Sequence, residues 1–237
     1  MKAYSNRYIF TFAAIMVIAV ATVLSVAAML LQPLQKKNVE VNKKQNILAA
    51  LNIASTAEDA EEKYDQYIRE SYVVNTKGER NPKGEAFKVD MKKELSKPQA
   101  EMNLPIFEAE VEGERKYVFT LRGKGLWGPI WGFIALSSDI NTIYGANFDH
   151  QGETPGLGAE ISTKWFQKQF IGKKIFDEQG QFVSIEVTKG NADPNALHKV
   201  DGVSGGTITS NGLDDMIETG LGYYMSYIKK LKEGSDE

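Results

Sequence analysis

The stretch IFEAEVEGERKYVFTLRG, residues 106–123, contains two apolar or alternating runs separated by the turn residues EGE. Alternation with a period of two is typical of β-strands, and a short glycine-containing turn between two such runs indicates an antiparallel pair. Two further strands are expected in GPIWGFIALSS and INTIYGANF, residues 128–138 and 140–148. The middle of the chain therefore predicts a mostly antiparallel sheet.

Helical patterns lie on both sides of these strands. Residues 57–71 predict a helix because acidic residues cluster near its start, where they complement the helix dipole. Residues 163–172 predict a short helix, and QFVSIEVTKG, residues 181–190, predicts another strand. Residues 212–231 predict a C-terminal helix, and helices flanking an antiparallel sheet define an α+β fold. The inward face of that last helix is expected to consist of Met216, Leu221, Tyr224 and Ile228.

The N-terminus contains IFTFAAIMVIAVATVLSVAAMLL, Ile9–Leu31, a run of 23 residues without a charged side chain. As a helix it would be about 34 Å long at about 1.5 Å per residue, which is enough to cross a bilayer core. The rival interpretation is a cleaved signal peptide, whose apolar region is usually shorter, although SVAA at residues 25–28 resembles a weak cleavage site. The length favours an uncleaved transmembrane anchor, with Pro33 marking its exit.

Composition excludes several classes of function. The 237-residue chain has no cysteine, which excludes disulfides, thiolate metal sites and iron–sulfur clusters. Its two histidines, His150 and His198, form no metal-ligand pattern, so no metal site is expected. Four basic and no acidic residues precede position 38, which leaves 24 basic and 31 acidic residues in the rest. An acidic domain without basic clusters is a poor nucleic-acid binder.

Two glycine-rich loops are candidate sites. DGVSGGTITSNG, residues 201–212, holds four hydroxyls and four glycines directly before the C-terminal helix. It fits either a phosphate cradle at a helix N-terminus or a helix cap at Ser210, with Asp214 and Asp215 complementing the dipole. HQGETPGLGAE, residues 150–160, fits either a simple turn or a glycine wall that lets a flat or phosphorylated ligand approach backbone N–H groups.

The first loop closely resembles the flavinylation motif D-G-x-[ST]-G-A-T-x-[ST], in which a flavin transferase moves FMN from FAD onto a threonine hydroxyl as a phosphoester. The resemblance implies that Thr207 is the acceptor. Gly206 departs from the alanine of the motif, and because glycine adds backbone freedom without bulk, attachment is expected to survive. The implied transferase-recognition frame consists of Asp201, Gly202, Ser204 and Gly205.

The second loop and the stretch GKGLWGPIWGFIAL resemble the FMN-binding domain shared by the NqrC subunits of sodium-translocating NADH:quinone reductases and the corresponding RnfG subunits of Rnf complexes. Chain length and GLWGPIWG favour the NqrC family, and the resemblance covers nearly the whole chain. It implies an electron carrier with covalent FMN, no catalytic residues of its own, and the other members of a six-subunit membrane complex as partners. The alternatives are an Rnf-type chain and a membrane-anchored module that binds FMN noncovalently.

The resemblance also implies residues that contact the flavin. Leu157 would lie against the ring and Thr154 would donate to its polar edge. Lys189, just before Gly190, fits either a positive charge near the pyrimidine edge or the phosphate, or an exposed lysine at the end of a strand. Trp127 and Trp131 fit either a place near the ring or a packing role. The implied cofactor-binding set is Glu153, Thr154, Gly156, Leu157, Gly158, Lys189, Ser204, Gly205, Gly206 and Thr209.

These features predict a transmembrane anchor at residues 1–34, a helical connecting region at 35–100 and an FMN-binding domain at 101–237. The resemblance implies a single-pass protein of the inner membrane with its domain on the periplasmic side. The flanking charges disagree, because Lys2 and Arg7 precede the span and four lysines follow it within residues 36–44. Long domains cross membranes largely regardless of such charges, so the periplasmic side is expected.

Overall fold

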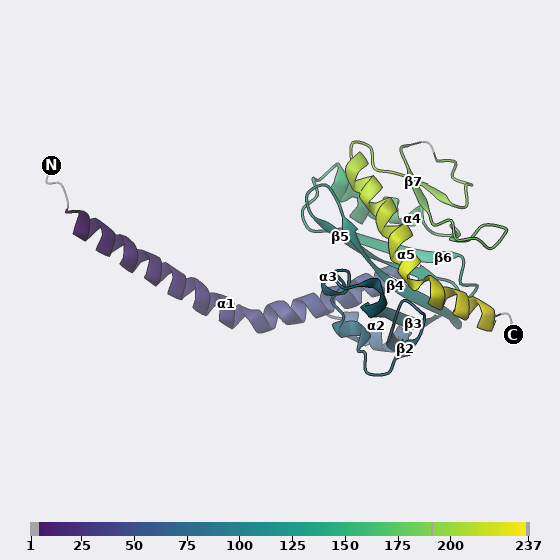
Figure 1. Cartoon of the computed structure of the whole chain (residues 1–237), viewed down its shortest axis with the longest axis horizontal. Coiled ribbons are helices and arrows are strands. Elements are labelled where there is room, and N and C mark those ends of the chain that lie inside the picture. The colour runs from purple at the N-terminus through teal and green to yellow at the C-terminus, as the bar shows by residue number, and fades with distance from the viewer. Residues whose placement is uncertain (1–4, 191, 236–237) are drawn as a thin grey trace. The chain divides into compact units, whose positions relative to one another are not determined.

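The computed structural model describes residues 5–190 and 192–235. The chain divides into two compact units, Met1–Lys43 and Lys44–Glu237. Helix α1, Asn6–Ala50, makes up the described part of the first unit, and its last residues, from Lys44 on, belong to the second (Figure 1). Lys2, one of the flanking charges discussed above, lies outside the described residues.

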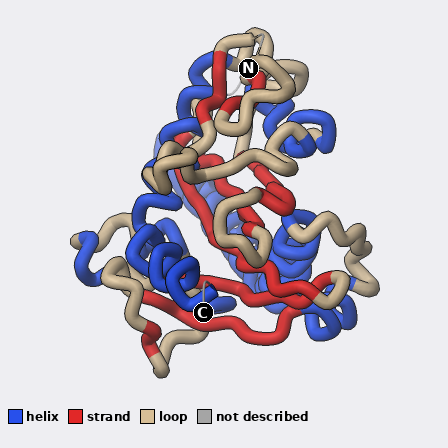
Figure 2. Tube along the Cα trace, turned by 90° about the vertical axis from the view of Figure 1, so that its right-hand side faces the viewer, coloured by secondary structure: helices blue, strands red, loops and turns tan. Residues whose placement is uncertain are grey.

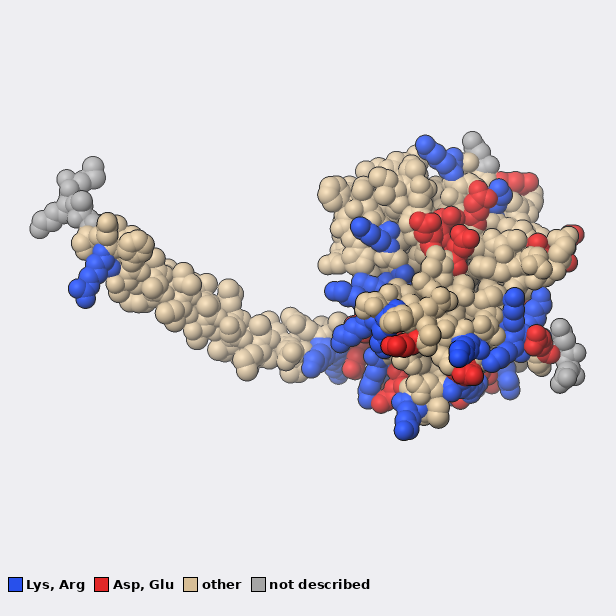
Figure 3. All heavy atoms as spheres, in the orientation of Figure 1, with Lys and Arg blue, Asp and Glu red and all other residues tan. Residues whose placement is uncertain are grey.

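Helix α1 is the one helix in the described part of the chain that is long and apolar enough to cross a membrane. Its apolar stretch exposes large side chains, with Phe10 at 74% exposure, and carries no charged side chain between Ile9 and Leu31 (Figure 3). Such a surface is unfavourable in water and suits a lipid environment. The helix continues through Pro33 to Ala50, so an exit from the membrane at Pro33 would lie within the helix, and it stays a prediction. Proline removes one backbone hydrogen bond, and here the helix tolerates that loss without ending.

The second unit is built on a six-stranded antiparallel sheet with the strand order β2-β1-β3-β4-β5-β6. Figure 2 draws the strands in red. The sheet comprises β1 Ile68–Val74, β2 Arg80–Asn81, β3 Leu104–Val111, β4 Glu114–Lys124, β5 Pro129–Leu136 and β6 Ile143–His150. The two strands expected within residues 106–123 are β3 and β4, and the turn between them contains Glu112 and Gly113, both with positive φ. The expected α+β fold with an antiparallel sheet is confirmed.

Helix α5, Thr207–Ser235, packs along β4 and covers one face of the sheet. Its predicted inward face is confirmed, because Met216, Leu221, Tyr224 and Ile228 are all buried. The Tyr224 hydroxyl is 3.1 Å from each of two carbonyl oxygens, those of Pro105 and Thr120, so the helix is tied to β3 and β4. Burial of these large side chains is the main stabilising contribution to this layer.

The opposite face of the sheet is covered by the end of α1, by α2, Ala60–Tyr67, and by the short helix η1, Ala86–Lys88. Ile47 and Leu51 are fully buried there against Phe107 and Val118. Two short helices, α3 Met91–Glu94 and η2 Gln99–Glu101, lead from this side into β3. The sheet is therefore buried on both faces.

Part of the region 35–100 departs from its helical prediction. The helix predicted for residues 57–71 ends at Tyr67, and β1 follows at once. Strand β1 buries three of its side chains, those of Tyr72, Val73 and Val74. Its pairing with β3 outweighs the local helical pattern of this segment. Residues 35–100 thus contribute two strands to the sheet, while the domain boundaries at 34 and 100 stay predictions.

The chain between β6 and α5 is less regular. It contains η3 Gly158–Ser162, α4 Lys164–Lys168, β7 Glu186–Thr188 and β8 Lys199–Asp201. Strands β7 and β8 form a separate parallel pair, so the strand predicted for residues 181–190 is confirmed only over three residues. Helix α5 begins at Thr207 rather than at residue 212, so half of the hydroxyl-rich stretch is helical.

We expect a chain that lacks residues 1–34 to be soluble and folded, because the sheet and both of its covering layers lie within residues 44–237. The measurement is fractionation of the truncated chain expressed alone, followed by circular dichroism of the soluble fraction. Recovery of the truncated chain with membranes would mean that a second membrane element exists.

Candidate functional site

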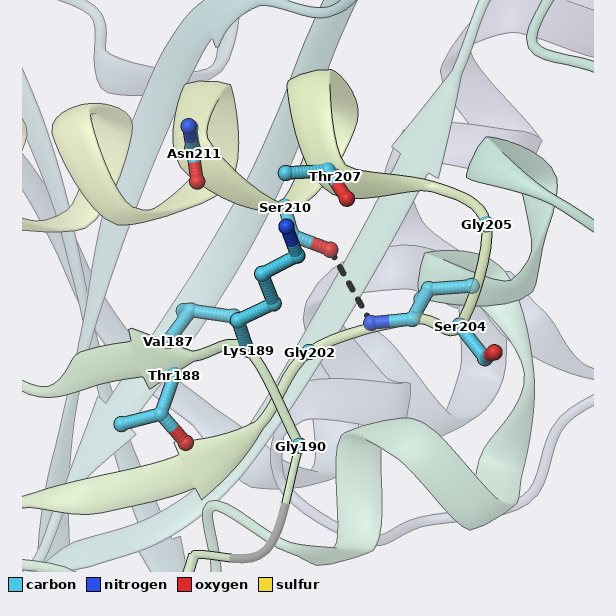
Figure 4. A pocket seen from close by; sticks show the side chains of 11 residues that line it. Val187, Thr188, Lys189, Gly190, Gly202, Ser204, Gly205, Thr207, Ser210 and Asn211 are labelled. Atoms are coloured by element: carbon cyan, nitrogen blue, oxygen red, sulfur yellow. Dashed lines mark hydrogen bonds between the residues drawn. The ribbon is translucent and has the colours of Figure 1, made fainter.

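Residues 202–206 form the turn between β8 and α5, and hydrogen bonds fix its shape. The Gly206 N–H donates to the Val203 carbonyl at 3.0 Å, and the Ser210 N–H donates to the Gly206 carbonyl at 2.8 Å. The Val203 N–H donates to Ser210 Oγ at 3.0 Å (Figure 4). Ser210 therefore holds the turn from within the helix, and its interpretation as a helix cap is wrong because α5 begins three residues earlier.

The four hydroxyls of this stretch fall into two groups. Thr209 and Ser210 are buried, with 1% and 4% exposure, and both hydroxyls make hydrogen bonds inside the protein. Ser204 is exposed and Thr207 is half-buried. Within the described residues, the hydroxyls of Ser204 and Thr207 form no hydrogen bond. Only these two hydroxyls are available to an external reactant.

A cavity of about 180 Å³ lies between the end of β7 and the first turn of α5. Thr207 and Ser204 line it from one side, and Lys189 and Gly190 line it from the other. Figure 4 shows the Lys189 side chain extending toward the first turn of α5. Among the described residues that line the cavity, none is acidic. A lysine together with the positive end of a helix suits an anion such as a phosphate.

The loop ETPGLG, residues 153–158, lies beside this turn. Leu157 is 41% exposed, and its side chain rests on Gly205, where an added Cβ would lie 2.6 Å from Leu157 Cδ2. Thr154 and Gly156 are exposed, while Glu153 and Gly158 are buried. The structure therefore brings the two glycine-rich loops together, as the resemblance implied.

Glu153 occupies the centre of this contact. Its Oε1 accepts from the Trp127 N–H at 2.9 Å, and its Oε2 accepts from Thr209 Oγ1 at 2.5 Å. The Glu153 N–H donates to His150 Nδ1 at 3.1 Å. Glu153 and Thr209 belong to the implied cofactor-binding set, and in this structure their side-chain oxygens form a hydrogen bond with each other inside the protein.

Hydrogen bonds within the protein also fix the first two residues of the implied transferase-recognition frame, Asp201 and Gly202. Asp201 Oδ1 accepts from the Ala192 N–H at 2.5 Å, and its own N–H donates to Gln169 Oε1 at 3.0 Å. The Gly202 N–H donates to the Thr188 carbonyl at 2.7 Å. These bonds place β8 beside the end of β7, and hence place the turn beside Lys189. The sequence gives no signal for the part played by Gln169.

Exposed apolar side chains lie on several segments close to this site. Trp127 is 70% exposed, Leu126 is 48% exposed, and Ile208, next to Thr207, is 59% exposed. Trp131 is only half-buried and lies on β5. Ile208 was not among the expected site residues, although an apolar residue between two hydroxyls at a helix start is a readable signal.

Asp214, on α5, connects this helix to β7, the strand that directly precedes Lys189. Its Oδ1 accepts from the Val187 N–H at 2.6 Å. Partial burial raises the pKa of Asp214 above its ordinary value, and the nearby carboxylates of Asp215, Glu186 and Glu218 raise it further. The Val187 N–H acts in the opposite direction. Acidic side chains gather over α5 on the face seen in Figure 3.

Comparison with known proteins defines the class of this site. Residues 125–222 match the family model of the FMN-binding domain. That range includes both glycine-rich loops, the buried Glu153 and most of α5. The chain is therefore an FMN-binding-domain protein.

Relatives narrow this class further. The chain is 31% identical over 231 residues to the C subunit of Na(+)-translocating NADH-quinone reductase from Vibrio vulnificus strain YJ016, with 90% of each chain covered. It resembles the crystal structure of the same kind of protein from Parabacteroides distasonis ATCC 8503, with a TM-score of 0.78 and 46% identity over 84% of this chain and 96% of that chain. Shewanella oneidensis NqrC shares the fold, with a TM-score of 0.72 and 24% identity over 83% and 99% of the two chains.

The chain belongs to the NqrC family, the C subunits of Na(+)-translocating NADH-quinone reductases. It is thus a member of an oxidoreductase complex and carries an FMN-binding domain. The NqrC family, favoured over the Rnf-type family from sequence, is confirmed.

We expect Asp214→Asn to stabilise the domain at pH 7.5, because asparagine keeps the oxygen that accepts from Val187 and removes the charge. The folded-state pKa of Asp214 is raised, so ionisation costs its full share of stability above that pKa. The cost shrinks as the pH falls below the folded-state pKa and is gone below the ordinary pKa of the unfolded chain. The gain should be no more than about 1 kcal/mol, because a partly exposed charge is screened.

The measurement is urea unfolding of wild type and variant at pH 7.5 and at successively lower pH. The difference between them should shrink on acidification. A variant that is less stable than wild type at pH 7.5 would contradict this account.

Proposed function

We propose that this chain carries FMN as a phosphoester on Thr207 Oγ1 and relays electrons within the reductase complex. A flavin transferase would move the FMN phosphoryl group from FAD to that hydroxyl. The new bond joins Oγ1 to phosphorus, the pyrophosphate bond of FAD breaks, AMP leaves, and the hydroxyl proton is released. The observation that carries the proposal is that Thr207 is the motif threonine and its hydroxyl opens into the cavity at the start of α5.

The surroundings of Thr207 fit a phosphate. The first turn of α5 presents its N-terminal end, and Lys189 supplies positive charge from the opposite side of the cavity. Ser204 adds an unengaged hydroxyl at the rim. Helix N-termini favour anions, and an ammonium adds a point charge. The same ammonium would favour the reduced, more negative state of a bound flavin.

The size of the cavity also fits a tethered cofactor. At about 180 Å³ it is smaller than the roughly 300 Å³ at which pockets for small molecules begin. It suits the phosphate and part of the ribityl chain, and leaves the flavin ring at the rim. Leu157 rests on Gly205 there, and the exposed Trp127 is held in place through Glu153. An exposed ring suits a carrier that must exchange electrons with partner proteins.

The wider setting follows from the family. We infer that helix α1 anchors the chain in the inner membrane, that the domain lies on the periplasmic side, and that the other five members of the complex are its partners. FAD, the transferase and Thr207 must meet in one compartment. A covalent bond keeps the flavin on the protein where free flavin is scarce.

We expect Thr207→Ala to abolish flavin labelling, because it removes the motif hydroxyl that opens into the cavity at the helix start. Thr207→Ser, which keeps a hydroxyl, should be labelled weakly. The measurement is fluorescence of the denatured protein in a gel after co-expression with the flavin transferase.

The matched control is Thr209→Ala, which removes a buried hydroxyl two residues away and should still be labelled at long incubation. A labelled Thr207→Ala chain would overturn the assignment of the acceptor. A wild-type chain that binds FMN in solution but shows no fluorescence after denaturation would favour the noncovalent module instead.

Topology has its own test. A periplasm-specific reporter fused after Glu237 should be active, and external protease should digest the domain in spheroplasts. The four lysines that follow the span do not prevent this, because long domains cross largely regardless of flanking charge. Reporter activity restricted to the cytoplasm would overturn the proposed localisation and the proposed place of flavin attachment.

A further inference from the structure

Glu153 is a buried carboxylate with no cation beside it. Its exposure is 5%, and among the described residues no lysine, arginine or histidine forms an ion pair with it. Burying a charge is costly unless hydrogen bonds compensate for it. Here the compensation comes from the Trp127 N–H and the Thr209 hydroxyl, one on each oxygen.

Those two donors belong to segments that are far apart in the chain. Trp127 lies between β4 and β5, Thr209 lies in the first turn of α5, and Glu153 begins the loop that contains Leu157. One carboxylate therefore joins the first turn of α5, which lines the cavity, to two segments that lie beside that turn. Leu157 makes a second contact between the loop and the turn, because its side chain rests on Gly205.

We propose that Glu153 is a positioning residue that sets the place of Thr207 by holding the first turn of α5 against the loop 153–158 and the segment of Trp127. Thr209 is two residues from Thr207 on the same turn, so a fixed Thr209 fixes the acceptor. The proposal rests on the proposed attachment at Thr207. It also gives a physical reason for a hydroxyl residue at the last position of the flavinylation motif.

The absence of a side chain at Gly158 leaves room for the hydrogen bond between Glu153 and Thr209. A Cβ on Gly158 would clash with Thr209 Oγ1 and would lie 2.5 Å from Glu153 Oε2. Any larger residue at position 158 would displace the bond between these two side chains. The loop thus needs its glycine at this point in order to let the carboxylate and the hydroxyl meet.

The experiment uses the purified full-length chain, the flavin transferase and FAD. Four variants are compared with wild type at a temperature well below unfolding: Glu153→Ala, Glu153→Gln, Thr209→Val and the double variant Glu153→Ala with Thr209→Val. The matched control is Glu160→Gln. Glu160 lies just after the loop, in η3, and within the described residues its carboxylate accepts only from the Gly156 N–H, at 3.0 Å. The readouts are the initial labelling rate and amide hydrogen exchange of the unlabelled protein.

We expect Glu153→Ala and Thr209→Val each to slow labelling by about tenfold, the size of effect that loss of a charge-assisted hydrogen bond gives. The double variant should be no slower than Glu153→Ala, because both changes remove one interaction. Glu153→Gln should recover most of the rate, since its amide can still accept from Trp127 and donate to Thr209 Oγ1. Glu160→Gln should match wild type.

Hydrogen exchange separates positioning from general stability. In Glu153→Ala, the amides of Trp127 and of the first turn of α5 should exchange faster, while those in the middle of β4 keep their protection. Equal acceleration throughout the domain, additive effects in the double variant, or a wild-type labelling rate in Glu153→Ala would each overturn the proposal.

If Glu153→Ala does not fold, Thr209→Val carries the same test. Wild-type labelling and wild-type exchange in that variant would then overturn the proposal. A failure of the proposed function is distinguishable, because it appears as labelling of Thr207→Ala or as no labelling of wild type.

Discussion

The close packing of α5 on β4 is the constraint on which the site depends. At Gly212 the helix approaches the strand so closely that an added Cβ would clash with the Lys124 carbonyl oxygen. Further along, Leu213, Ile217 and Leu221 are fully buried in the same interface. Because the helix cannot shift along or away from the strand, its first turn has a fixed place. The Thr207 hydroxyl, the cavity and the hydrogen bond between Glu153 and Thr209 all lie at or beside that end.

The sequence predicted those elements whose hydrophobic spacing or motif lies within a single segment of the chain. Strands β3 to β6 and the inward face of α5 follow from period-two and period-3.6 spacing, and the two loops follow from their motifs. Strand β1 was missed because its sequence continues the polar pattern of α2, and only pairing with β3 makes it a strand. The contact between Glu153 and Thr209 joins positions 56 residues apart, and no local pattern encodes it. The sequence therefore pointed to Thr207 as the proposed acceptor but gave no sign of the contact that holds its helical turn.

The division of the four hydroxyls shows how one short motif serves two purposes. Thr209 and Ser210 point inward and use their hydroxyls to fasten the helix start to the loop and to the preceding turn. Ser204 and Thr207 are left at the surface of the cavity. A hydroxyl engaged in a buried hydrogen bond would have to give it up before reacting, at a cost of about 1–3 kcal/mol. The inward pair thus fastens the start of the helix, and the outward pair leaves a hydroxyl free for the proposed attachment.

The charges around α5 follow from the same arrangement. The helix start and Lys189 make the cavity positive, whereas Asp214, Asp215 and Glu218 make the next turns negative. Partial burial raises the pKa of Asp214, and repulsion from the neighbouring carboxylates raises it further, so this carboxylate destabilises the fold when it is ionised. In return, Asp214 accepts a hydrogen bond from the Val187 N–H and so ties β7 to α5. Val187 lies on β7, two residues before Lys189. Asp214 therefore fixes the end of β7, and with it the place of Lys189, which follows that strand directly and lines the cavity beside Thr207.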